Sequence, residues 1–195
     1  MTDLPANRTA SPAVLPLIPA RWSPRSFDGT AVPEADLLTM IEAAGWAPSA
    51  FNVQPWTFLY ALRGDAHWET FLSLLVEFNQ SWAKDAGALL FVVSQETSGS
   101  EGQPLYSHSF DTGAAWATLA LQAQHMGWHS HGMTGIDFEH ARAALALPEG
   151  FRLEAAIAIG RMAPAERLPE GLREREVPST RKPVSEIARR GIWPA

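Results

Sequence analysis

The segment Gly45–Tyr60, "GWAPSAFNVQPWTFLY", decides how the two elements beside it are arranged. Residues 33–44 come before it, with a proline at the first position, early acids and apolar side chains at helical spacing, so they predict a helix. The segment ends inside an apolar run, Trp56–Leu62, that predicts a buried strand. The turn between them carries two amides, Asn52 and Gln54, which a plain connection does not need.

The same patterns continue along the chain and predict an α+β or α/β sandwich around one sheet. No linker separates two domains, and we expect an irregular arm over 1–20, one domain over 21–195 and a Pro-rich tail over about 161–195 that wraps a partner subunit. The predicted elements are a helix over 66–77, a strand over 88–94, a helix over 112–127 capped by Asp111, a helix over 138–147 capped by Asp137, and a strand over 152–160.

The predicted helix over 112–127, "TGAAWATLALQAQHMG", is apolar nearly all round and rich in Gly and Ala. A helix without a polar face is buried on all sides, and small side chains let two backbones approach closely. In a short chain the covering partner can be a second copy, so we expect a homodimer. The alternative is the central helix of a monomer.

The composition excludes several classes of function. The chain has 195 residues, of which 46% are hydrophobic, which suits one globular domain. A net charge of −6 argues against a nucleic-acid binder or a protein of anionic membranes. No apolar run approaches the ~20 residues of a membrane span, and the early acid and scattered prolines do not resemble a signal peptide. The absence of Cys excludes thiolate catalysis and fits a cytoplasmic protein.

Several catalytic motifs are absent: there is no G-x-x-x-x-G-K-[ST], no G-x-G-x-x-G and no G-x-S-x-G. His125, His129 and His131 cluster in "HMGWHSH", and the last two would share a face if this segment were a strand. A metal site needs a further ligand, and no acid stands at ligand spacing, so we expect surface or capping histidines. His108, in the polar loop over 95–108, could line a pocket.

Two basic clusters suggest an anion site. In "RWSPRSF", Arg21, Ser23 and Arg25 alternate, so in an extended segment the three side chains point the same way. Two guanidiniums and a hydroxyl suit a phosphate, although the motif taken alone favours a solvated basic turn that pairs with nearby acids. Near the other end, Arg181 and Lys182 could meet the same phosphate.

Taken in order, these segments resemble the nitroreductase family of FMN-dependent oxidoreductases over residues 21–187. The most specific part is the A-P-S-x-x-N-x-Q-P-W pattern over 47–56. The resemblance implies a homodimer of α+β subunits, each with a central, mostly antiparallel sheet flanked by helices, and FMN bound at the interface. The implied FMN-binding residues are Arg21, Trp22, Ser23 and Arg25, the turn residues Pro48, Ser49, Ala50 and Asn52 facing the neighbouring subunit's flavin with Gln54 supporting the turn, Asn79, the backbone of Met133, Thr134 and Gly135, and Arg181 with Lys182. Trp22 and Pro24 depart from the basic or small residues that are commoner in the family.

The resemblance also implies a reaction. Bound FMN would take hydride from NADH or NADPH and reduce a small-molecule acceptor, such as a nitroaromatic or a quinone, in a ping-pong pattern. No side-chain nucleophile and no metal are then required. The alternatives are a flavin-binding or flavin-delivery protein without turnover, and a family member with another flavin chemistry such as enone reduction or dehydrogenation.

Overall fold

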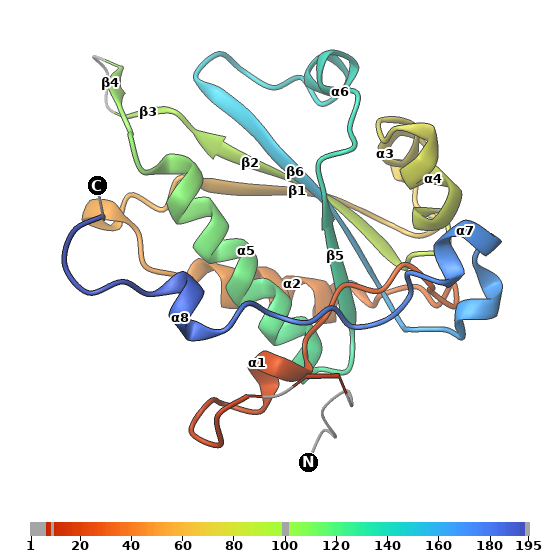
Figure 1. Cartoon of the computed structure of the whole chain (residues 1–195). Helices are drawn as coiled ribbons and strands as arrows, with labels where there is room; N and C mark the ends of the chain where they lie inside the picture. Colours follow the sequence, from red (N-terminus) through yellow and green to blue (C-terminus); the bar gives the residue numbers. More distant parts are fainter. Residues whose placement is uncertain (1–6, 9, 99–101, 194–195) are drawn as a thin grey trace.

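A four-stranded antiparallel sheet forms the centre of the molecule (Figure 1). The computed structural model describes residues 7–8, 10–98 and 102–193. The strand order is β1-β2-β6-β5, and every neighbouring pair is antiparallel. The strands are β1 (Trp56–Leu62), β2 (Ala88–Gln95), β5 (His129–Met133) and β6 (Phe151–Gly160).

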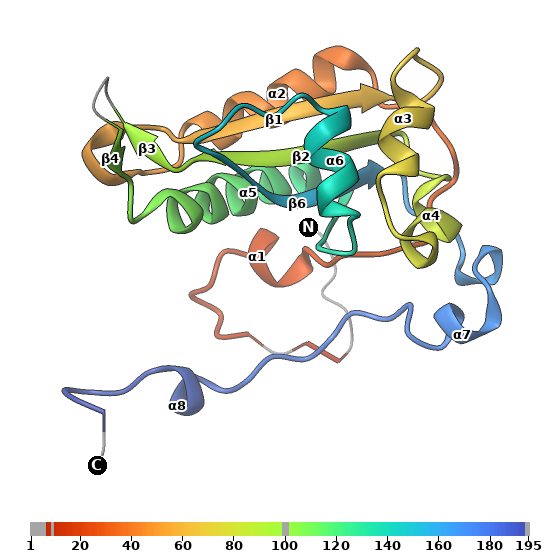
Figure 2. The same ribbon diagram turned by 90° about the horizontal axis from the view of Figure 1, so that it is seen from above.

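Helices cover both faces of this sheet, which therefore has two apolar cores (Figure 2). Along β2, Leu90 and Val92 belong to one core, whereas Phe91 and Val93 belong to the other. Because β2 is buried on both faces, its sequence is continuously apolar instead of alternating. Helices α2 (Glu34–Gly45) and α5 (His108–His125) cover the first face, and α3 (Trp68–Ser73), α4 (Glu77–Ala83) and α6 (Phe138–Ala144) cover the second.

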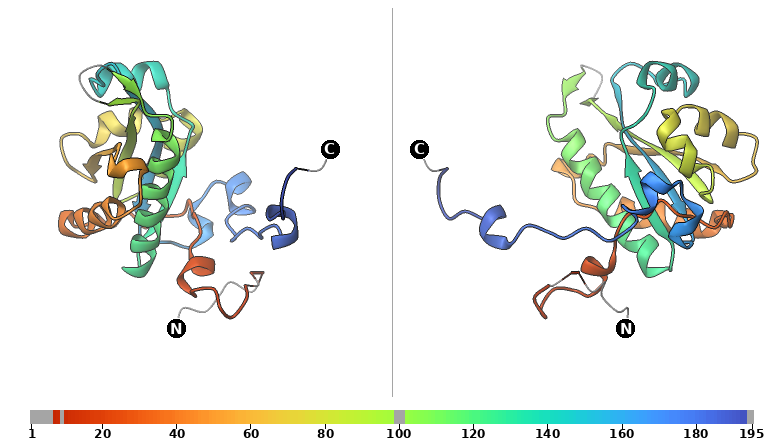
Figure 3. Two further views of the ribbon diagram at one scale, coloured as in Figure 1. Left: turned by 90° about the vertical axis from the view of Figure 1, so that its left-hand side faces the viewer. Right: turned by 45° about the vertical axis from the view of Figure 1, so that its right-hand side comes forward.

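The two ends of the chain leave the body on the same side (Figure 3). The arm carries α1 (Leu17–Ala20). In the tail, every described residue from Ser179 onward is exposed. None of the helices in the described part of the chain has the length and hydropathy that a transmembrane segment needs. The remaining short elements are η1 (Ala50–Asn52), the strand pair β3 (Thr97–Ser98) and β4 (Gln103–Pro104), η2 (Ala165–Arg167), α7 (Glu170–Arg173) and α8 (Val184–Ile187).

The main predicted elements are confirmed. The helix after Pro33, the strand Trp56–Leu62 and the strands over 88–94 and 152–160 lie where expected, with ends that differ by at most one residue. Asp137 caps α6 by accepting a hydrogen bond from the backbone N–H of His140 at 3.1 Å. Helix α6 ends earlier than predicted, because Ala146 adopts a positive φ of 49°.

The predicted single helix over 66–77 is wrong. The chain forms α3, breaks over Leu74–Val76, and starts again as α4. The break has a long-range cause: Leu75 pairs with Ile136 in an isolated β-bridge, and the Val76 N–H donates to the carbonyl of Gly135 at 3.1 Å. A helical period in the sequence does not reveal such tertiary pairing.

The predicted capping role of Asp111 is also wrong. Helix α5 begins at His108, so Asp111 lies within its first turn and is buried. Its carboxylate accepts hydrogen bonds from Ser107 Oγ at 2.8 Å and from the backbone N–H of Ala50 at 3.1 Å. The acid therefore ties α5 to the turn that precedes β1, instead of starting the helix.

Candidate functional site

Five arginines surround one cavity of about 310 Å³, here called the arginine cavity. They come from the arm, from the segment before α2 and from the tail, which are far apart in sequence. No Asp or Glu lines the cavity in the described part of the chain. Its lining residues are Arg8, Arg21, Trp22, Ser23, Arg25, His131, Arg175, Val177, Ser179 and Arg181.

The segment that carries Arg21, Ser23 and Arg25 is extended, as the alternation predicted. It continues to Phe27, which forms an isolated antiparallel bridge with Met162. Phe27 is fully buried in the core beside Trp82. The burial of Phe27 fixes the end of this extended segment. Nearer its start, Arg21 Nη1 donates a hydrogen bond to Ser23 Oγ at 3.2 Å.

Like charges are held together in the arginine cavity. Burial, and then the neighbouring Arg181 guanidinium, lower the pKa of Arg21. Burial lowers the pKa of Arg25 as well, with Arg175 adding to the effect and the Glu176 carboxylate opposing it. The described ion pairs lie elsewhere, between Glu154 and its neighbours His108 and Arg152. Such a cluster of partly desolvated cations attracts an anion.

His131 forms one wall of the arginine cavity from β5. Its Nδ1 lies 3.0 Å from the carbonyl oxygen of Pro24, and because a carbonyl only accepts, Nδ1 carries the proton. Burial is the main cause that lowers the pKa of His131 to about 4. This histidine is therefore neutral at pH 7 and partly buried, which corrects the expectation of a surface or capping residue. Within residues 7–8, 10–98 and 102–193, no group of three metal-ligating side chains could hold an ion.

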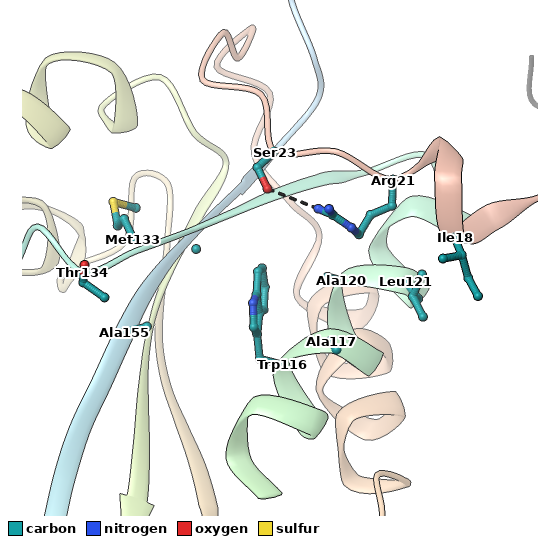
Figure 4. Close-up of a pocket in the computed structure, with 11 residues that line it drawn as sticks. Ile18, Arg21, Ser23, Trp116, Ala117, Ala120, Leu121, Met133, Thr134 and Ala155 are labelled. Atoms are coloured by element: carbon teal, nitrogen blue, oxygen red, sulfur yellow. Dashed lines mark hydrogen bonds between the residues drawn. The ribbon is translucent and has the colours of Figure 1, made fainter. Parts of the chain in front are cut away.

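A second cavity of about 600 Å³, here called the platform cavity, adjoins the first, and Arg21 and Ser23 line both. Figure 4 shows Arg21 and Ser23 at one side, Thr134 at the other, and the indole of Trp116 between them. A Cβ on Gly132 would lie 3.0 Å from Trp116, so the glycine leaves space for this ring. The other lining residues are mostly apolar: Ile18, Ala117, Ala120, Leu121, Gly132, Met133 and Ala155.

Asn79 and Gly135 lie against each other next to the platform cavity. The buried Asn79 amide donates a hydrogen bond to the Gly135 carbonyl at 3.0 Å. A Cβ on Gly135 would stand 2.4 Å from Asn79 Nδ2, so only glycine fits here. The break between α3 and α4 creates this contact, because it pairs residues 75–76 with residues 135–136.

The turn over residues 48–54 lies apart from the two cavities. Ser49 Oγ accepts a hydrogen bond from the backbone N–H of Gln54 at 3.0 Å, and Gln54 Nε2 donates to the Asn52 carbonyl at 3.1 Å. Phe51, Asn52 and Gln54 all have positive φ, which is uncommon for residues other than glycine. Pro48, Ala50 and Asn52 are exposed, so within one subunit this turn faces solvent.

The comparison with family models decides the classification. The nitroreductase family model matches residues 18–75 and 61–161, which together span more than half of the chain. The chain belongs to the nitroreductase family. An NADH dehydrogenase of Thermus thermophilus is 31% identical, over 80% of this chain and 95% of that protein.

Solved structures support the nitroreductase fold. An oxidoreductase containing FMN has a TM-score of 0.94 and 47% identity, covering 100% of this chain and 99% of that one. A nitroreductase from Desulfovibrio desulfuricans, solved in complex with FMN, has a TM-score of 0.73 and 25% identity, covering 95% of this chain and 100% of that one. The fold and the family expected from the sequence are thus confirmed.

The structure of this nitroreductase places most of the predicted residues at the two adjoining cavities, and the turn over 48–54 apart from them. Arg21, Trp22, Ser23, Arg25 and Arg181 line the arginine cavity, and Met133 and Thr134 line the platform cavity. Lys182 points elsewhere: it lines a groove between the arm and the tail. The roles assigned to all of these residues stay predictions.

Among the lining residues that the sequence did not predict in this nitroreductase, four have charged or aromatic side chains: Arg8, Trp116, His131 and Arg175. Arg8 belongs to the arm, which lies outside the resemblance, and Trp116 belongs to a helix whose apolar pattern indicates burial and not a ligand. His131 carries a signal, its alternation with His129, but that spacing by itself does not indicate an anion site.

Proposed function

We propose that this nitroreductase is an FMN-dependent oxidoreductase that takes hydride from NADH or NADPH and passes electrons to a small electrophilic acceptor, such as a nitroaromatic or a quinone. The observation that carries the proposal is the arginine cavity, which five guanidiniums and, among the described residues, no carboxylate line beside an apolar platform. The likeness to the FMN-containing oxidoreductase supports the choice of flavin.

The arginine cavity fits the phosphate of FMN. A phosphomonoester carries up to two negative charges and several acceptor oxygens, and arginine binds such oxygens bidentately. Burial lowers the pKa of Arg21, and the nearby positive charge of the Arg181 guanidinium lowers it further by repulsion. A dianion between them would remove this repulsion. Ser23, which lies within hydrogen-bonding distance of Arg21, would add a hydroxyl donor.

The platform cavity fits a flat aromatic ring. Trp116 and the small side chains of Ala117 and Ala155 line it, and Thr134 marks its far side from Arg21 (Figure 4). The backbone of residues 133–135 would present its polar groups to the ring edge. Asn79, fixed by its hydrogen bond to the Gly135 carbonyl, would help to orient that edge of the ring. Lys182 would have to move from its groove to join the phosphate.

A homodimer would complete the site. Phe51 and Phe110 are 101% and 82% exposed, and Trp46 and Tyr106 are also largely exposed. Exposed apolar side chains of this size indicate a contact surface. The turn over 48–54 is tied to the same surface through the hydrogen bond from Ala50 to Asp111. In a dimer, Pro48, Ser49, Ala50 and Asn52 would reach the cofactor of the partner subunit, with Gln54 supporting the turn.

In this reaction the protein positions the reactants. The redox chemistry itself would be supplied by bound FMN. The arginines hold the phosphate, the platform orients the ring, and the dimer contact excludes water from one side of it. Donor and acceptor would use the other side in turn, which is a ping-pong pattern. The cytoplasmic location expected from the cysteine-free sequence stays a prediction.

Flavin binding tests the proposal. The full chain is incubated with FMN, desalted, and examined by visible absorbance. We expect flavin to stay with the protein in proportion to the protein concentration. NADH or NADPH oxidation is then followed with menadione and a nitrofuran as acceptors. A colourless protein after desalting would contradict the proposal, and a flavin-loaded protein that oxidises neither nucleotide would indicate the flavin-delivery alternative.

A further inference from the structure

Arg8 of the N-terminal arm connects the two chain segments that supply Arg21 and Arg181 to the arginine cavity. Its Nη1 donates to the carbonyl of Arg21 at 2.6 Å and to that of Pro19 at 2.7 Å. Its Nε donates to the carbonyl of Ser179 at 3.0 Å. Arg21 and Ser179 are far apart in sequence, and Ser179 stands two residues before Arg181. One side chain thus joins the backbone beside both of the predicted phosphate-binding arginines.

Arg8 makes these hydrogen bonds although two neighbouring guanidiniums repel its positive charge. Burial, followed by the neighbouring guanidiniums of Arg181 and Arg21, lowers the pKa of Arg8. Every partner of Arg8 in the described residues is a neutral carbonyl. An anion bound between Arg21 and Arg181 would offset the repulsion that Arg8 meets at this position.

The adjacent Asn7 supports the same arrangement, because its side-chain amide donates to the carbonyl of Pro178. The arm therefore meets the tail at two successive residues on each side, 7–8 against 178–179. Glu176 ties the tail to the backbone N–H groups of Arg25 and Ser26. Together these contacts fix the tail at residues 176, 178 and 179, just before Arg181.

We propose that Arg8 is a positioning residue for a phosphomonoester, holding Arg21 and Arg181 against one phosphate. The proposal rests on the proposed function, since it takes the phosphate to be that of FMN. Arg8 and residues 10–21 of the arm are then part of the cofactor site. Affinity for the phosphate depends on them, whereas affinity for the flavin ring does not.

The test compares FMN with riboflavin, which lacks the phosphate. Binding of both to the full-length apoprotein is measured by quenching of flavin fluorescence, for wild type, R8A and R190A. Arg190 is an exposed tail arginine outside the cavity, so R190A controls for loss of a charge. We expect R8A to lose FMN affinity by roughly ten- to a hundredfold, as for a charge-assisted hydrogen bond, with riboflavin affinity unchanged. R190A should change neither.

A double variant tests the positioning role. If Arg8 acts through Arg21, the FMN affinity lost in R8A/R21A is smaller than the product of the two single losses. Losses that multiply, an unchanged FMN affinity in R8A, or an equal loss for FMN and riboflavin would each overturn the proposal. If wild type binds FMN no better than riboflavin, the phosphate site of the proposed function fails instead. Thermal unfolding of R8A checks that the variant is folded.

Discussion

The Glu176 carboxylate accepts a hydrogen bond from the backbone N–H of Arg25 at 2.7 Å, across 151 residues of chain. The same oxygen, Oε1, accepts from the N–H of Ser26 at 2.8 Å, whereas Oε2 is buried without a partner among the described residues. This carboxylate also favours the charged form of Arg25. One acid thus fastens the tail to the predicted phosphate-binding segment and offsets part of the positive charge.

We expect Glu176→Ala to lower the free energy of unfolding by about 1–3 kcal/mol, because two backbone donors lose their acceptor. Glu176→Gln keeps an acceptor oxygen, so its loss should be smaller. Urea denaturation at pH 7 measures both, with the exposed neighbour Glu174→Ala as control. Equal stability of the alanine variant and wild type would show that the tail is not fastened here.

Arg21→Ala tests the predicted phosphate contact. The change removes a guanidinium that lines both cavities, so FMN binding should weaken by about 1.5–3 kcal/mol, the range for a hydrogen bond to a charged group. Fluorescence titration of the apoprotein gives the dissociation constant. Arg167→Ala, an exposed arginine of η2, should leave it unchanged. An unaltered dissociation constant for Arg21→Ala would mean that this residue does not hold the phosphate.

His131 should make stability depend on pH. Its pKa is about 4 in the folded protein and near the ordinary 6.5 in the unfolded chain. Between these values the unfolded chain binds a proton that the native protein does not, so the free energy of unfolding falls as the pH is lowered through this window, and the loss levels off below pH 4. From pH 7 to pH 5 this residue should contribute a loss of about 2 kcal/mol.

His131→Asn isolates that contribution, since asparagine does not titrate and can still donate to the Pro24 carbonyl. Urea denaturation at pH 7 and pH 5 should show a smaller pH-dependent loss for this variant than for wild type. His140→Asn, at an exposed histidine of α6, should behave as wild type. The prediction fails if His131→Asn loses as much stability as wild type over the same pH range.

Phe110→Glu tests the dimer. A charge placed at a side chain that is 82% exposed costs little in a monomer but opposes burial in an interface. Light scattering after size exclusion should find dimers for wild type and mostly monomers for Phe110→Glu. Phe78→Glu changes another exposed phenylalanine, on α4, and should stay dimeric. A monomeric wild type, or a Phe110→Glu variant that remains dimeric, would contradict the proposed interface.

The sequence predicts the parts of this nitroreductase that local pattern determines. The strand over 88–94 is apolar throughout because both its faces are buried, and Asp137 caps its helix by a contact three residues away. The prediction failed where distant segments decide the structure. Residues 74–76 leave the helical pattern because they pair with residues 135–137, and Asp111 is buried because it binds the turn at Ala50.

In the candidate site, too, local spacing was predictive and contacts between distant segments were not. Arg21, Ser23 and Arg25 alternate in sequence, and that spacing alone brings them to one side of an extended segment. Arg8 carries no such signal, because its partners are backbone carbonyls reached only when the arm and the tail lie together. Neither composition nor spacing encodes that contact.

The central claim is that this protein binds FMN and reduces it with a nicotinamide. The most direct measurement is the visible spectrum of the FMN-loaded protein under anaerobic conditions, before and after NADH or NADPH is added, and again after menadione is added. We predict that the flavin absorbance is lost with at least one of the two nucleotides and returns with menadione. A flavin absorbance that neither nucleotide changes would contradict the account.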